Sequence, residues 1–280
     1  MDDLGTYAVN TWCPGCGNFG ILNAFKNAVR RLESDGLSRR DLAMVAGIGC
    51  HGKIFDYLNL SGFYSLHGRA VATAQGMKLG NPRLKVVVFV GDGDAYGEGV
   101  AHLLFAAKRD ADIAVIVHNN GTYGLTTGQA TPTSVKGFRG PSTPTGSVED
   151  PFNPLALMLS AGATFVARGY PMKMDQLADL FARAIQHEGF ALVDVLQPCV
   201  TFNNTYDLYN RTVAEMDVVP QSFEDSLGAA RRTDKILLGV IRDAEGDPYH
   251  RRLLGERRPA ESRRSSTQRL AAIRKELAQR

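Results

Sequence analysis

The sequence lacks the features of a membrane or exported protein. No apolar run among its 280 residues approaches the roughly 20 residues that a membrane-spanning helix needs. The opening segment MDDLGTYAVN is acidic and polar, where a signal peptide would be basic and then apolar. We therefore expect a cytoplasmic protein with no membrane partner. With 44% hydrophobic and 22% charged residues, the composition also excludes a disordered or collagen-like chain and allows a real hydrophobic core.

The net charge of +3 is unevenly distributed along the chain. Residues 251–280 contain nine Arg and one Lys against three Glu, so this tail is strongly basic and the preceding residues are net acidic. The tail has no aromatic residue that could stack on bases, which argues against a nucleic-acid partner. We expect a solvated tail or one that docks on a protein partner.

Short apolar runs rich in β-branched residues alternate with longer stretches of helical period. This pattern predicts an α/β fold, in which a mostly parallel sheet has helices on both faces. The expected strands are Leu42–Ile48, Lys85–Val90, Ile113–His118, Thr164–Ala167 and Ala191–Leu196. The expected helices are Phe19–Leu32, Arg69–Leu79, Gly97–Lys108 and Met174–His187. We expect one domain over residues 1–218 and then a helical, Arg-rich extension over 219–280, which docks on a partner or is partly disordered.

A glycine-rich turn follows the expected strand 85–90, with Gly91, Asp92, Gly93 and Asp94 at its start. Such a turn lets the backbone approach a diphosphate, although the glycine spacing differs from the dinucleotide fingerprint. A carboxylate beside a phosphate repels it unless a cation lies between them, so Asp92 indicates Mg²⁺. Gly-Asp-Gly by itself would more often mark a tight surface turn.

A pair of asparagines, Asn119 and Asn120, follows the next expected strand. The chain has 25 residues from Asp94 to His118, which is room for one helix and one returning strand. A right-handed crossover then brings both strand ends to the same edge of the sheet. Because Mg²⁺ prefers oxygen ligands, Asp92 and the asparagine pair together predict a magnesium site beside a diphosphate.

The four cysteines form one close pair and two separate residues. Cys13 and Cys16 lie in WCPGCG, and Cys50 and Cys199 each follow an expected strand. Only one CxxC is present, so a zinc ribbon built from two such pairs is not supported. Four thiolates next to a cofactor suit a 4Fe–4S cluster better than a structural zinc. Spacing alone leaves two alternatives open: Cys50 and Cys199 as small buried hydrophobic residues, or Cys13 and Cys16 as a redox pair.

Two further features bear on a site. His67 begins an expected helix near Arg69, where a phosphate could bind, or it is a solvent-exposed helix cap. Residues 121–154 are crowded with Gly, Thr, Ser and Pro, and a loop of that length after a strand end indicates function. The histidines without identifiable partners are expected to be structural: His102, His118 and His187.

Six motifs then resemble a known family. WCPGCG, GIGCHG, LHGRA, GDGDAYGEG, HNNGTYGLTTGQATPT and LQPCVTFN, in this order over residues 10–205, resemble the β subunit of 2-oxoacid:ferredoxin oxidoreductases. Gly-Asp-Gly followed by Asn-Asn resembles the signature of thiamine diphosphate enzymes. The resemblance implies Mg²⁺ held by Asp92, the Asn120 side chain and the Thr122 carbonyl. It implies a 4Fe–4S cluster on Cys13, Cys16, Cys50 and Cys199, and thiamine diphosphate contacts at Ile48, Gly49, Cys50, His51, His67, Gly91, Gly93, Asp94, Gly124 and Leu125.

The resemblance also implies an activity and partners. The reaction would be oxidative, coenzyme A-dependent decarboxylation of a 2-oxoacid, with 2-oxoglutarate favoured over pyruvate and electrons passing through the cluster to ferredoxin. The activating glutamate is expected on the pyrimidine-binding domain of an α subunit, so no catalytic residue is expected in this chain. A dimer of heterodimers is expected.

Two residues depart from the family pattern, and the sequence leaves two other functions open. His51 stands where relatives often have Ser, and Thr127 stands where some relatives have Lys. One alternative is a non-redox thiamine diphosphate decarboxylase or synthase subunit with idle cysteines. The other is a nucleic-acid-binding protein stabilised by a four-cysteine zinc site, against which Asp92 in the glycine loop counts.

Overall fold

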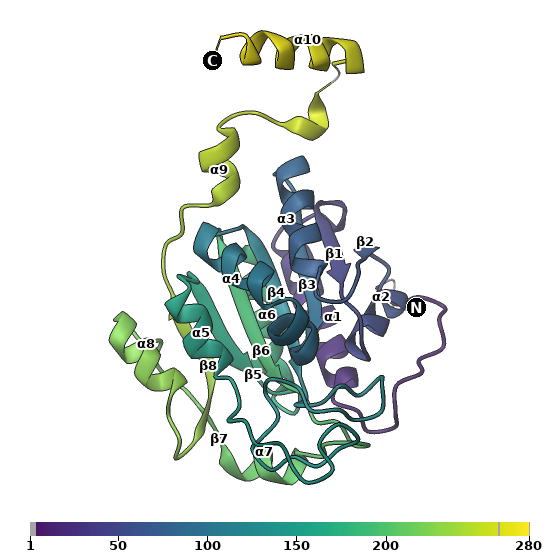
Figure 1. Cartoon of the computed structure of the whole chain (residues 1–280), viewed down its shortest axis with the longest axis vertical. Helices are drawn as coiled ribbons and strands as arrows, with labels where there is room; N and C mark the ends of the chain where they lie inside the picture. The colour runs from purple at the N-terminus through teal and green to yellow at the C-terminus, as the bar shows by residue number, and fades with distance from the viewer. Residues whose placement is uncertain (1–3, 263, 280) are drawn as a thin grey trace.

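The computed structural model describes residues 4–262 and 264–279, and its centre is an eight-stranded sheet (Figure 1). The strands are β1 Leu42–Ala46, β2 Ser61–Tyr64, β3 Lys85–Gly91, β4 Ile113–Asn119, β5 Phe165–Gly169, β6 Phe190–Leu196, β7 Val213–Glu215 and β8 Ile236–Asp243. Their order across the sheet is β2-β1-β3-β4-β6-β5-β8-β7. All neighbouring strands are parallel except β5 and β8. The mostly parallel α/β fold predicted from the sequence is confirmed.

Helices connect most of these strands. The α-helices are α1 Asn18–Ser34, α2 Ile54–Tyr57, α3 Ala70–Gly80, α4 Val100–Arg109, α5 Pro154–Ser160, α6 Met174–Gln186, α7 Tyr206–Thr212, α8 Phe223–Ala230, α9 Tyr249–Leu254 and α10 Ser266–Leu277. Short 3₁₀ turns lie at η1 Arg39–Asp41, η2 His51–Lys53 and η4 Pro259–Glu261, and a π-helical turn at η3 Gly93–Glu98.

The helices cover both faces of the sheet, as expected. Helices α1 and α6 pack on one face, and α3, α4 and α5 pack on the other. Successive residues of β3 point to opposite faces, so Val87 and Phe89 join the first cluster while Val86 and Val88 join the second. This burial on both sides explains why the strands are continuously hydrophobic rather than alternating.

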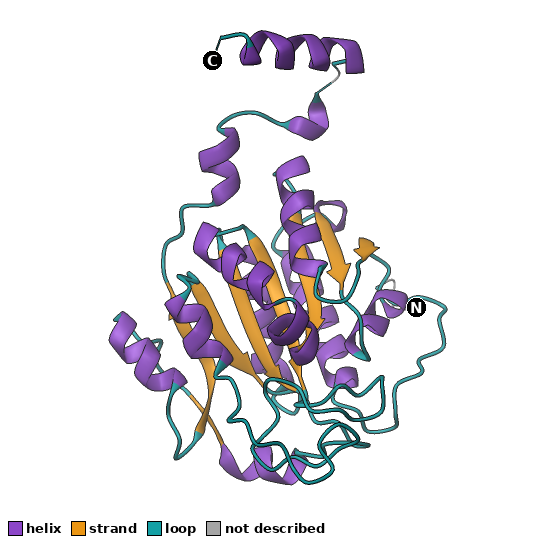
Figure 2. Cartoon of the chain, viewed as in Figure 1, coloured by secondary structure: helices purple, strands orange, loops and turns teal. Residues whose placement is uncertain are grey.

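The carboxyl ends of the central strands meet at one edge of the sheet, where the long loops gather (Figure 2). The turn that contains Asp92 follows β3, and Asn120 follows β4. Two cysteine segments also arrive at this edge, because Cys50 follows β1 and Cys199 follows β6. The crossover argument from the sequence is therefore realised in the fold.

The boundary expected after residue 218 does not coincide with the edge of the sheet. Strand β8 lies within the segment expected to be a helical extension, and it pairs antiparallel with β5. The apolar run of residues 236–241 has the length of a strand rather than of a helix. As a strand it pairs with β5, and this pairing buries its apolar side chains. Helical structure without strands begins only at α9, and Arg263 and Arg280 of the basic tail lie outside the described residues.

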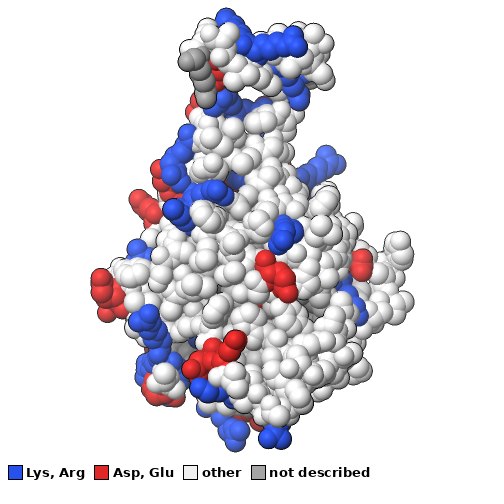
Figure 3. Space-filling view, viewed as in Figure 1, with Lys and Arg blue, Asp and Glu red and all other residues white. Residues whose placement is uncertain are grey.

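The C-terminal arm leaves the sheet domain after α9. The Tyr249 main-chain N–H donates to the Asp110 carbonyl at 3.1 Å, which ties α9 to the turn after α4. Every described residue from 255 to 279 is exposed, and several Lys and Arg side chains are visible along this arm on the face drawn in Figure 3. Within the described part of the chain, no helix has the length and apolar character needed to cross a membrane.

His187 after α6 supplies a test of the fold's pH dependence. Its Nε2 atom lies 2.8 Å from the Thr164 hydroxyl, and burial lowers the pKa of His187 from its ordinary 6.5, against the opposing effect of Asp243. The folded chain therefore binds this proton less tightly than the unfolded chain, and stability is lost as pH falls below about 6.5. We expect His187→Gln to shrink the fall in Tm between pH 7.5 and 5.5 by a few degrees in thermal unfolding.

The matched control for this experiment is His102→Gln, which changes the same residue type in α4. This control is expected to keep the wild-type fall in Tm. If His187→Gln also keeps it in full, the buried imidazole is not a source of the pH dependence.

Candidate active site

Two adjoining cavities open at the carboxyl edge of the sheet. The first, here the aspartate cavity, has a volume of about 460 Å³. Every residue predicted to contact thiamine diphosphate or Mg²⁺ lines it: Ile48, Gly49, Cys50, His51, His67, Gly91, Asp92, Gly93, Asp94, Asn120, Thr122, Gly124 and Leu125. The second, here the cysteine cavity, has a volume of about 430 Å³ and is lined by all four cysteines.

Asp92 is a buried carboxylate held by the long loop. The hydroxyls of Thr131 and Thr133 donate to its Oδ2 atom at 2.5 and 2.6 Å. The Asn120 main-chain N–H lies 3.4 Å from Oδ1, a long hydrogen bond that leaves this oxygen weakly satisfied. Burial raises the pKa of Asp92, and the two threonine hydroxyls oppose that rise. A neighbouring cation would favour the ionised carboxylate.

The donors around Asp92 fit a hard cation. The Asn120 side-chain oxygen accepts from the Thr122 main-chain N–H at 3.0 Å, which fixes this turn and leaves a second lone pair on the oxygen. The Asn203 amide donates to the Asn120 carbonyl at 2.8 Å and ties the turn to the segment after β6. Carboxylate, amide and carbonyl oxygens are the ligands that Mg²⁺ prefers, so the residues present suit this ion.

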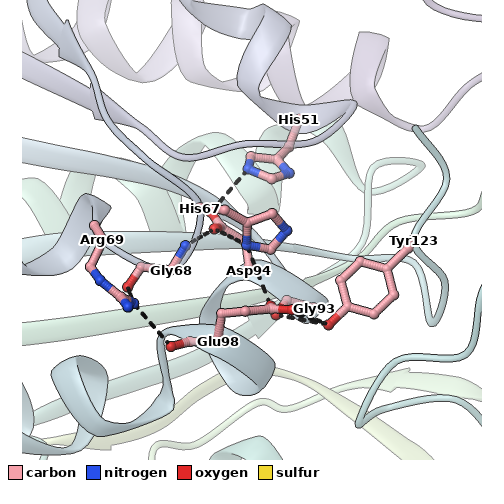
Figure 4. A network of polar contacts seen from close by, with 8 residues as sticks. All are labelled: His51, His67, Gly68, Arg69, Gly93, Asp94, Glu98 and Tyr123. Carbon is pink, nitrogen blue, oxygen red and sulfur yellow. Dashed lines mark hydrogen bonds and ion pairs between the residues drawn. The ribbon is translucent and has the colours of Figure 1, made fainter. Parts of the chain in front are cut away.

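Asp94 lies at the centre of a second polar group in the same cavity (Figure 4). The Gly68 main-chain N–H donates to its Oδ1 atom at 2.5 Å. The nearest nitrogens of His67 and His51 lie 3.1 and 3.3 Å from the carboxylate, but neither contact has hydrogen-bond geometry. Buried polar atoms without partners are uncommon in proteins, and here they border a cavity that a polar ligand could fill.

Tyr123 closes one side of this group. Its hydroxyl lies 3.2 Å from a Glu98 carboxylate oxygen, and burial together with Glu98 raises the pKa of Tyr123. A Cβ at Gly93 would lie 2.2 Å from the Tyr123 ring, so only glycine allows the ring to cover this turn. The glycine is thus required by close packing of the loop against the turn.

Glycines also shape the cysteine cavity. Gly15 has a φ of +81°, which closes the turn in which the Cys16 N–H donates to the Cys13 carbonyl at 3.0 Å. A Cβ at Gly17 would lie 2.9 Å from Pro198, where the Gly17 N–H donates to the Pro198 carbonyl at 3.2 Å. These contacts bring the N-terminal CxxC against the segment that carries Cys199.

The cysteine sulfurs have polar neighbours. The Thr201 hydroxyl lies 3.3 Å from Cys13 Sγ, and the Gln197 amide lies 3.6 Å from Cys16 Sγ. Burial, together with the neighbouring thiols, raises the pKa of Cys16 to about 11, and burial raises the pKa of Cys50. Among the described residues, no three His, Cys, Asp or Glu side chains are grouped closely enough for one metal ion.

This chain is similar to known proteins in both sequence and structure. Residues 47–195, which include Asp92 and Asn120, match the family described as thiamine pyrophosphate enzyme, C-terminal TPP binding domain. The 2-oxoacid:ferredoxin oxidoreductase subunit beta of Sulfolobus sp. is 48% identical over 215 residues, which is 75% of this chain and 70% of that protein. The chain belongs to the family of 2-oxoacid:ferredoxin oxidoreductase β subunits. It is therefore a subunit of an oxidoreductase and carries a thiamine diphosphate-binding domain.

Two further relatives agree with this assignment. The 2-oxoglutarate oxidoreductase subunit KorB of Mycobacterium tuberculosis is 43% identical over 209 residues, 74% of this chain and 55% of that protein. The structure of 2-oxoglutarate:ferredoxin oxidoreductase from Magnetococcus marinus, with 2-oxoglutarate, coenzyme A and succinyl-CoA bound, matches with a TM-score of 0.85 and 34% identity. That match covers 99% of this β subunit and 90% of the other chain.

Three residues at or behind the aspartate cavity of the β subunit were not identified from the sequence: Thr131 and Thr133, which contact Asp92, and His118. Thr131 and Thr133 were hidden in the threonine-rich loop, although their spacing of two residues in ATPTS was a signal. His118 was expected to be structural, but it lines the aspartate cavity, where its Nδ1 atom lies 2.8 Å from the Asn18 amide oxygen. Burial, with a smaller effect of His51, lowers the pKa of His118 well below 6.5.

Thr127 of the β subunit has an unusual backbone. Its φ of +77° lies in the left-handed region, which is unfavourable for a β-branched residue. The strain is held by the hydrogen bond from the Thr127 N–H to the Gly124 carbonyl at 3.2 Å. Thr127 is thus a strained point of the loop beside the aspartate cavity.

Gly124 lies between the two cavities of the β subunit, and both are lined by it. A Cβ at Gly124 would lie 3.5 Å from Cys50 Sγ and 3.8 Å from Cys199 Sγ, which are ordinary van der Waals distances. A side chain longer than that of alanine would therefore have to extend into one of the two cavities. We expect Gly124→Leu to weaken thiamine diphosphate binding roughly 5- to 150-fold and to lower iron content, since overpacking costs about 1–3 kcal/mol. Cofactor and iron analysis of the purified protein checks both.

The control is Gly76→Leu on α3, where an added Cβ meets no atom within 4 Å. It should retain both cofactor and iron. Wild-type contents of both in Gly124→Leu would show that this glycine does not separate two occupied sites.

Proposed function

We propose that this β subunit binds thiamine diphosphate in the aspartate cavity through Mg²⁺. The ion is held by Asp92, the side chain of Asn120 and the carbonyl of Thr122. The further cofactor contacts are the other predicted residues that line the cavity: Ile48, Gly49, Cys50, His51, His67, Gly91, Gly93, Asp94, Gly124 and Leu125. The support is the burial of Asp92 among oxygen donors and the glycine turn against which a diphosphate fits.

The second part of the proposal concerns the cysteines. Cys13, Cys16, Cys50 and Cys199 hold one 4Fe–4S cluster in the cysteine cavity. In a cluster each thiolate binds a different iron, so the four sulfurs surround a wider group than a single ion. The hydroxyl of Thr201 and the amide of Gln197 are placed to donate to cluster ligands, which is how proteins adjust the potential of such a group.

The reaction is oxidative, coenzyme A-dependent decarboxylation of a 2-oxoacid to acyl-CoA and CO₂, with ferredoxin as the electron acceptor. Thiamine diphosphate supplies the carbanion chemistry when bound. In this chain, Asp92 balances the charge of the ion, the glycine turn places the backbone against the diphosphate, and Tyr123 covers the turn. An α subunit with a pyrimidine-binding domain supplies the activating glutamate and completes a dimer of heterodimers.

We favour 2-oxoglutarate as the substrate, with pyruvate next. The relative from Mycobacterium tuberculosis is named a 2-oxoglutarate oxidoreductase subunit, and the Magnetococcus marinus structure has 2-oxoglutarate bound. Leu125 is half exposed at the rim of the aspartate cavity, where an apolar part of a substrate or partner would contact it.

One observation carries the proposal. The aspartate and cysteine cavities share Cys50, Asn120, Gly124 and Gln197, so a cofactor in one lies against a group in the other. A redox enzyme that removes electrons from a cofactor-bound intermediate needs this adjacency. A decarboxylase with idle cysteines does not.

The test uses the full chain, co-expressed with the α subunit from its gene neighbourhood and purified without oxygen. We expect about four irons and four acid-labile sulfides per β subunit, bound thiamine diphosphate, and coenzyme A-dependent reduction of ferredoxin. Across a panel of 2-oxoacids, 2-oxoglutarate should give the highest kcat/KM.

Each alternative predicts a different result. Decarboxylation without ferredoxin reduction, in protein with no iron after reconstitution, would replace the proposal by a non-redox thiamine diphosphate enzyme. Colourless, zinc-containing protein with steeply salt-dependent binding to DNA or RNA would indicate the nucleic-acid-binding function. A higher kcat/KM with pyruvate would change the substrate and leave the reaction class intact.

A further inference from the structure

A carboxylate outside the predicted site is buried in the middle of the sheet. Asp194 lies in β6 with no exposed surface, and its register neighbours are Val117 of β4 and Arg168 of β5. The adjacent residues Val193 and Val195 join the hydrophobic cluster on one face, so Asp194 points to the other face among apolar side chains. Such a carboxylate is costly unless it is paired and hydrogen-bonded, so its contacts indicate what it does.

Asp194 has two hydrogen-bonding partners and one charged neighbour. The Tyr96 hydroxyl donates to its Oδ1 atom at 2.9 Å. The side-chain amide of Asn119 lies 3.1 Å from Oδ1 and 3.4 Å from Oδ2. Arg168 Nε lies 3.7 Å from Oδ2 without hydrogen-bond geometry, so it contributes charge compensation rather than a directed contact. Burial raises the pKa of Asp194, and Arg168, Tyr96 and Asn119 oppose that rise.

Both hydrogen-bonding partners come from the segments that carry the proposed magnesium ligands. Tyr96 lies in the π-helical turn Gly93–Glu98 that immediately follows Asp92. Asn119 is the last residue of β4 and immediately precedes Asn120. Asp194 therefore contacts both segments that carry the proposed magnesium ligands. These segments follow β3 and β4, which are neighbouring strands, and Asp194 lies in β6 on the other side of β4.

A continuous chain of contacts leads from Asp194 to Asp92. The Asn119 amide that donates to Asp194 has its oxygen 2.9 Å from the Thr133 hydroxyl. The same Thr133 hydroxyl lies 2.6 Å from Asp92 Oδ2. Because Asp194 accepts from the amide nitrogen, it fixes which end of the Asn119 amide faces Thr133. The Thr133 hydroxyl has a single proton and two acceptors, the Asn119 oxygen and Asp92 Oδ2, so the orientation of the Asn119 amide sets how strongly Thr133 donates to Asp92.

We propose that Asp194 is a positioning residue for the magnesium–diphosphate site, acting through Tyr96 on the glycine turn and through Asn119 and Thr133 on Asp92. This inference rests on the proposed function, since it assumes that Asp92 binds Mg²⁺. Residues that orient metal ligands without touching the metal change metal affinity by roughly 10- to 100-fold when they are replaced. A residue that only stabilises the sheet would change thermal stability and leave the metal affinity of the folded protein unchanged.

The experiment measures Mg²⁺ binding directly, without turnover. The metal-free complex of the full chain with its α subunit is titrated with MgCl₂ at saturating thiamine diphosphate, with isothermal calorimetry as the readout. We expect Asp194→Asn to weaken the apparent Mg²⁺ affinity roughly 10- to 100-fold, because one acceptor and the charge are lost. Tyr96→Phe removes one hydroxyl from the same network, and we expect it to weaken the affinity roughly tenfold.

Tyr170→Phe is the matched control, because this buried tyrosine donates its hydroxyl to Asn210 at 2.9 Å in another part of the fold. It should lower stability to a similar extent as Tyr96→Phe and leave Mg²⁺ affinity at the wild-type value. If Asp194→Asn does not fold, the comparison of Tyr96→Phe with Tyr170→Phe decides the question.

The outcomes separate this inference from the proposed function. If wild-type protein binds no Mg²⁺ with thiamine diphosphate, the proposed function itself fails. If wild-type protein binds Mg²⁺ and Asp92→Ala abolishes that binding, while Tyr96→Phe and every folded Asp194→Asn preparation bind like wild type, the positioning role alone is overturned.

Discussion

Asp92→Ala is expected to abolish magnesium-dependent binding of thiamine diphosphate and to lower turnover roughly 10³-fold. The reason is that a bound ion contributes several kcal/mol to holding and neutralising the diphosphate, and about 1.4 kcal/mol corresponds to a factor of ten. Asp92 supplies the only charge among the proposed ligands, since the oxygens of Asn120 and Thr122 carry none, and the second buried carboxylate of this turn, Asp94, contacts Gly68 instead. Cofactor content after purification and calorimetric titration with Mg²⁺ measure the effect.

Iron content provides an internal check on this variant, because the four thiols line the other cavity. Asp92→Ala should therefore keep wild-type iron and colour. The control is Asp150→Ala, which removes an exposed carboxylate that pairs with Lys136 at 3.2 Å and should change neither cofactor. Unaltered thiamine diphosphate content in Asp92→Ala would remove the magnesium assignment.

Cys50→Ala is expected to reduce iron from about four atoms per chain to nearly none and to eliminate ferredoxin reduction. A 4Fe–4S cluster needs all four thiolates in place, and Cys50 is the cysteine that lines both cavities. The loss should be as severe for Cys199→Ala, although the two residues are far apart in sequence. Iron and sulfide analysis together with the visible absorption spectrum measure it.

This pair of variants also distinguishes the interpretations that spacing left open. If Cys13 and Cys16 were a redox pair, Cys50→Ala and Cys199→Ala would keep wild-type colour and activity. Thr201→Val is the control, because it removes the hydroxyl 3.3 Å from Cys13 Sγ and leaves four thiols. We expect this control to retain its iron.

The central sheet could be predicted because its strands are buried on both faces. Strands β3, β4 and β6 are continuously hydrophobic and lie within one residue of the expected bounds. Strand β8 was missed because charged residues flank its apolar run, and its antiparallel partner β5 is distant in sequence. Helix α4 begins at Val100 rather than Gly97, since the π-helical turn Gly93–Glu98 occupies the preceding residues.

The site was predictable to the extent that topology determines it. Parallel strands joined by a crossover end at the same edge of the sheet, so Asp92 and Asn120 could be placed at one edge without coordinates. The contacts of Thr131 and Thr133 with Asp92 could not be predicted, since they depend on the path of the irregular loop between β4 and α5. The role of Asp194 was also hidden, because one acidic residue in an apolar run gives no sign of its partners.

The exposed C-terminal arm makes this chain easy to divide with a protease. The described residues 255–262 and 264–279 expose many Lys and Arg side chains, and loop-like exposed segments are where trypsin cuts first. Early cleavage would release α10 and leave β8 paired in the sheet, since β8 lies well before the arm. The rate of this cleavage, compared between the free chain and the complex with its α subunit, therefore reports directly on whether the arm is shielded on assembly.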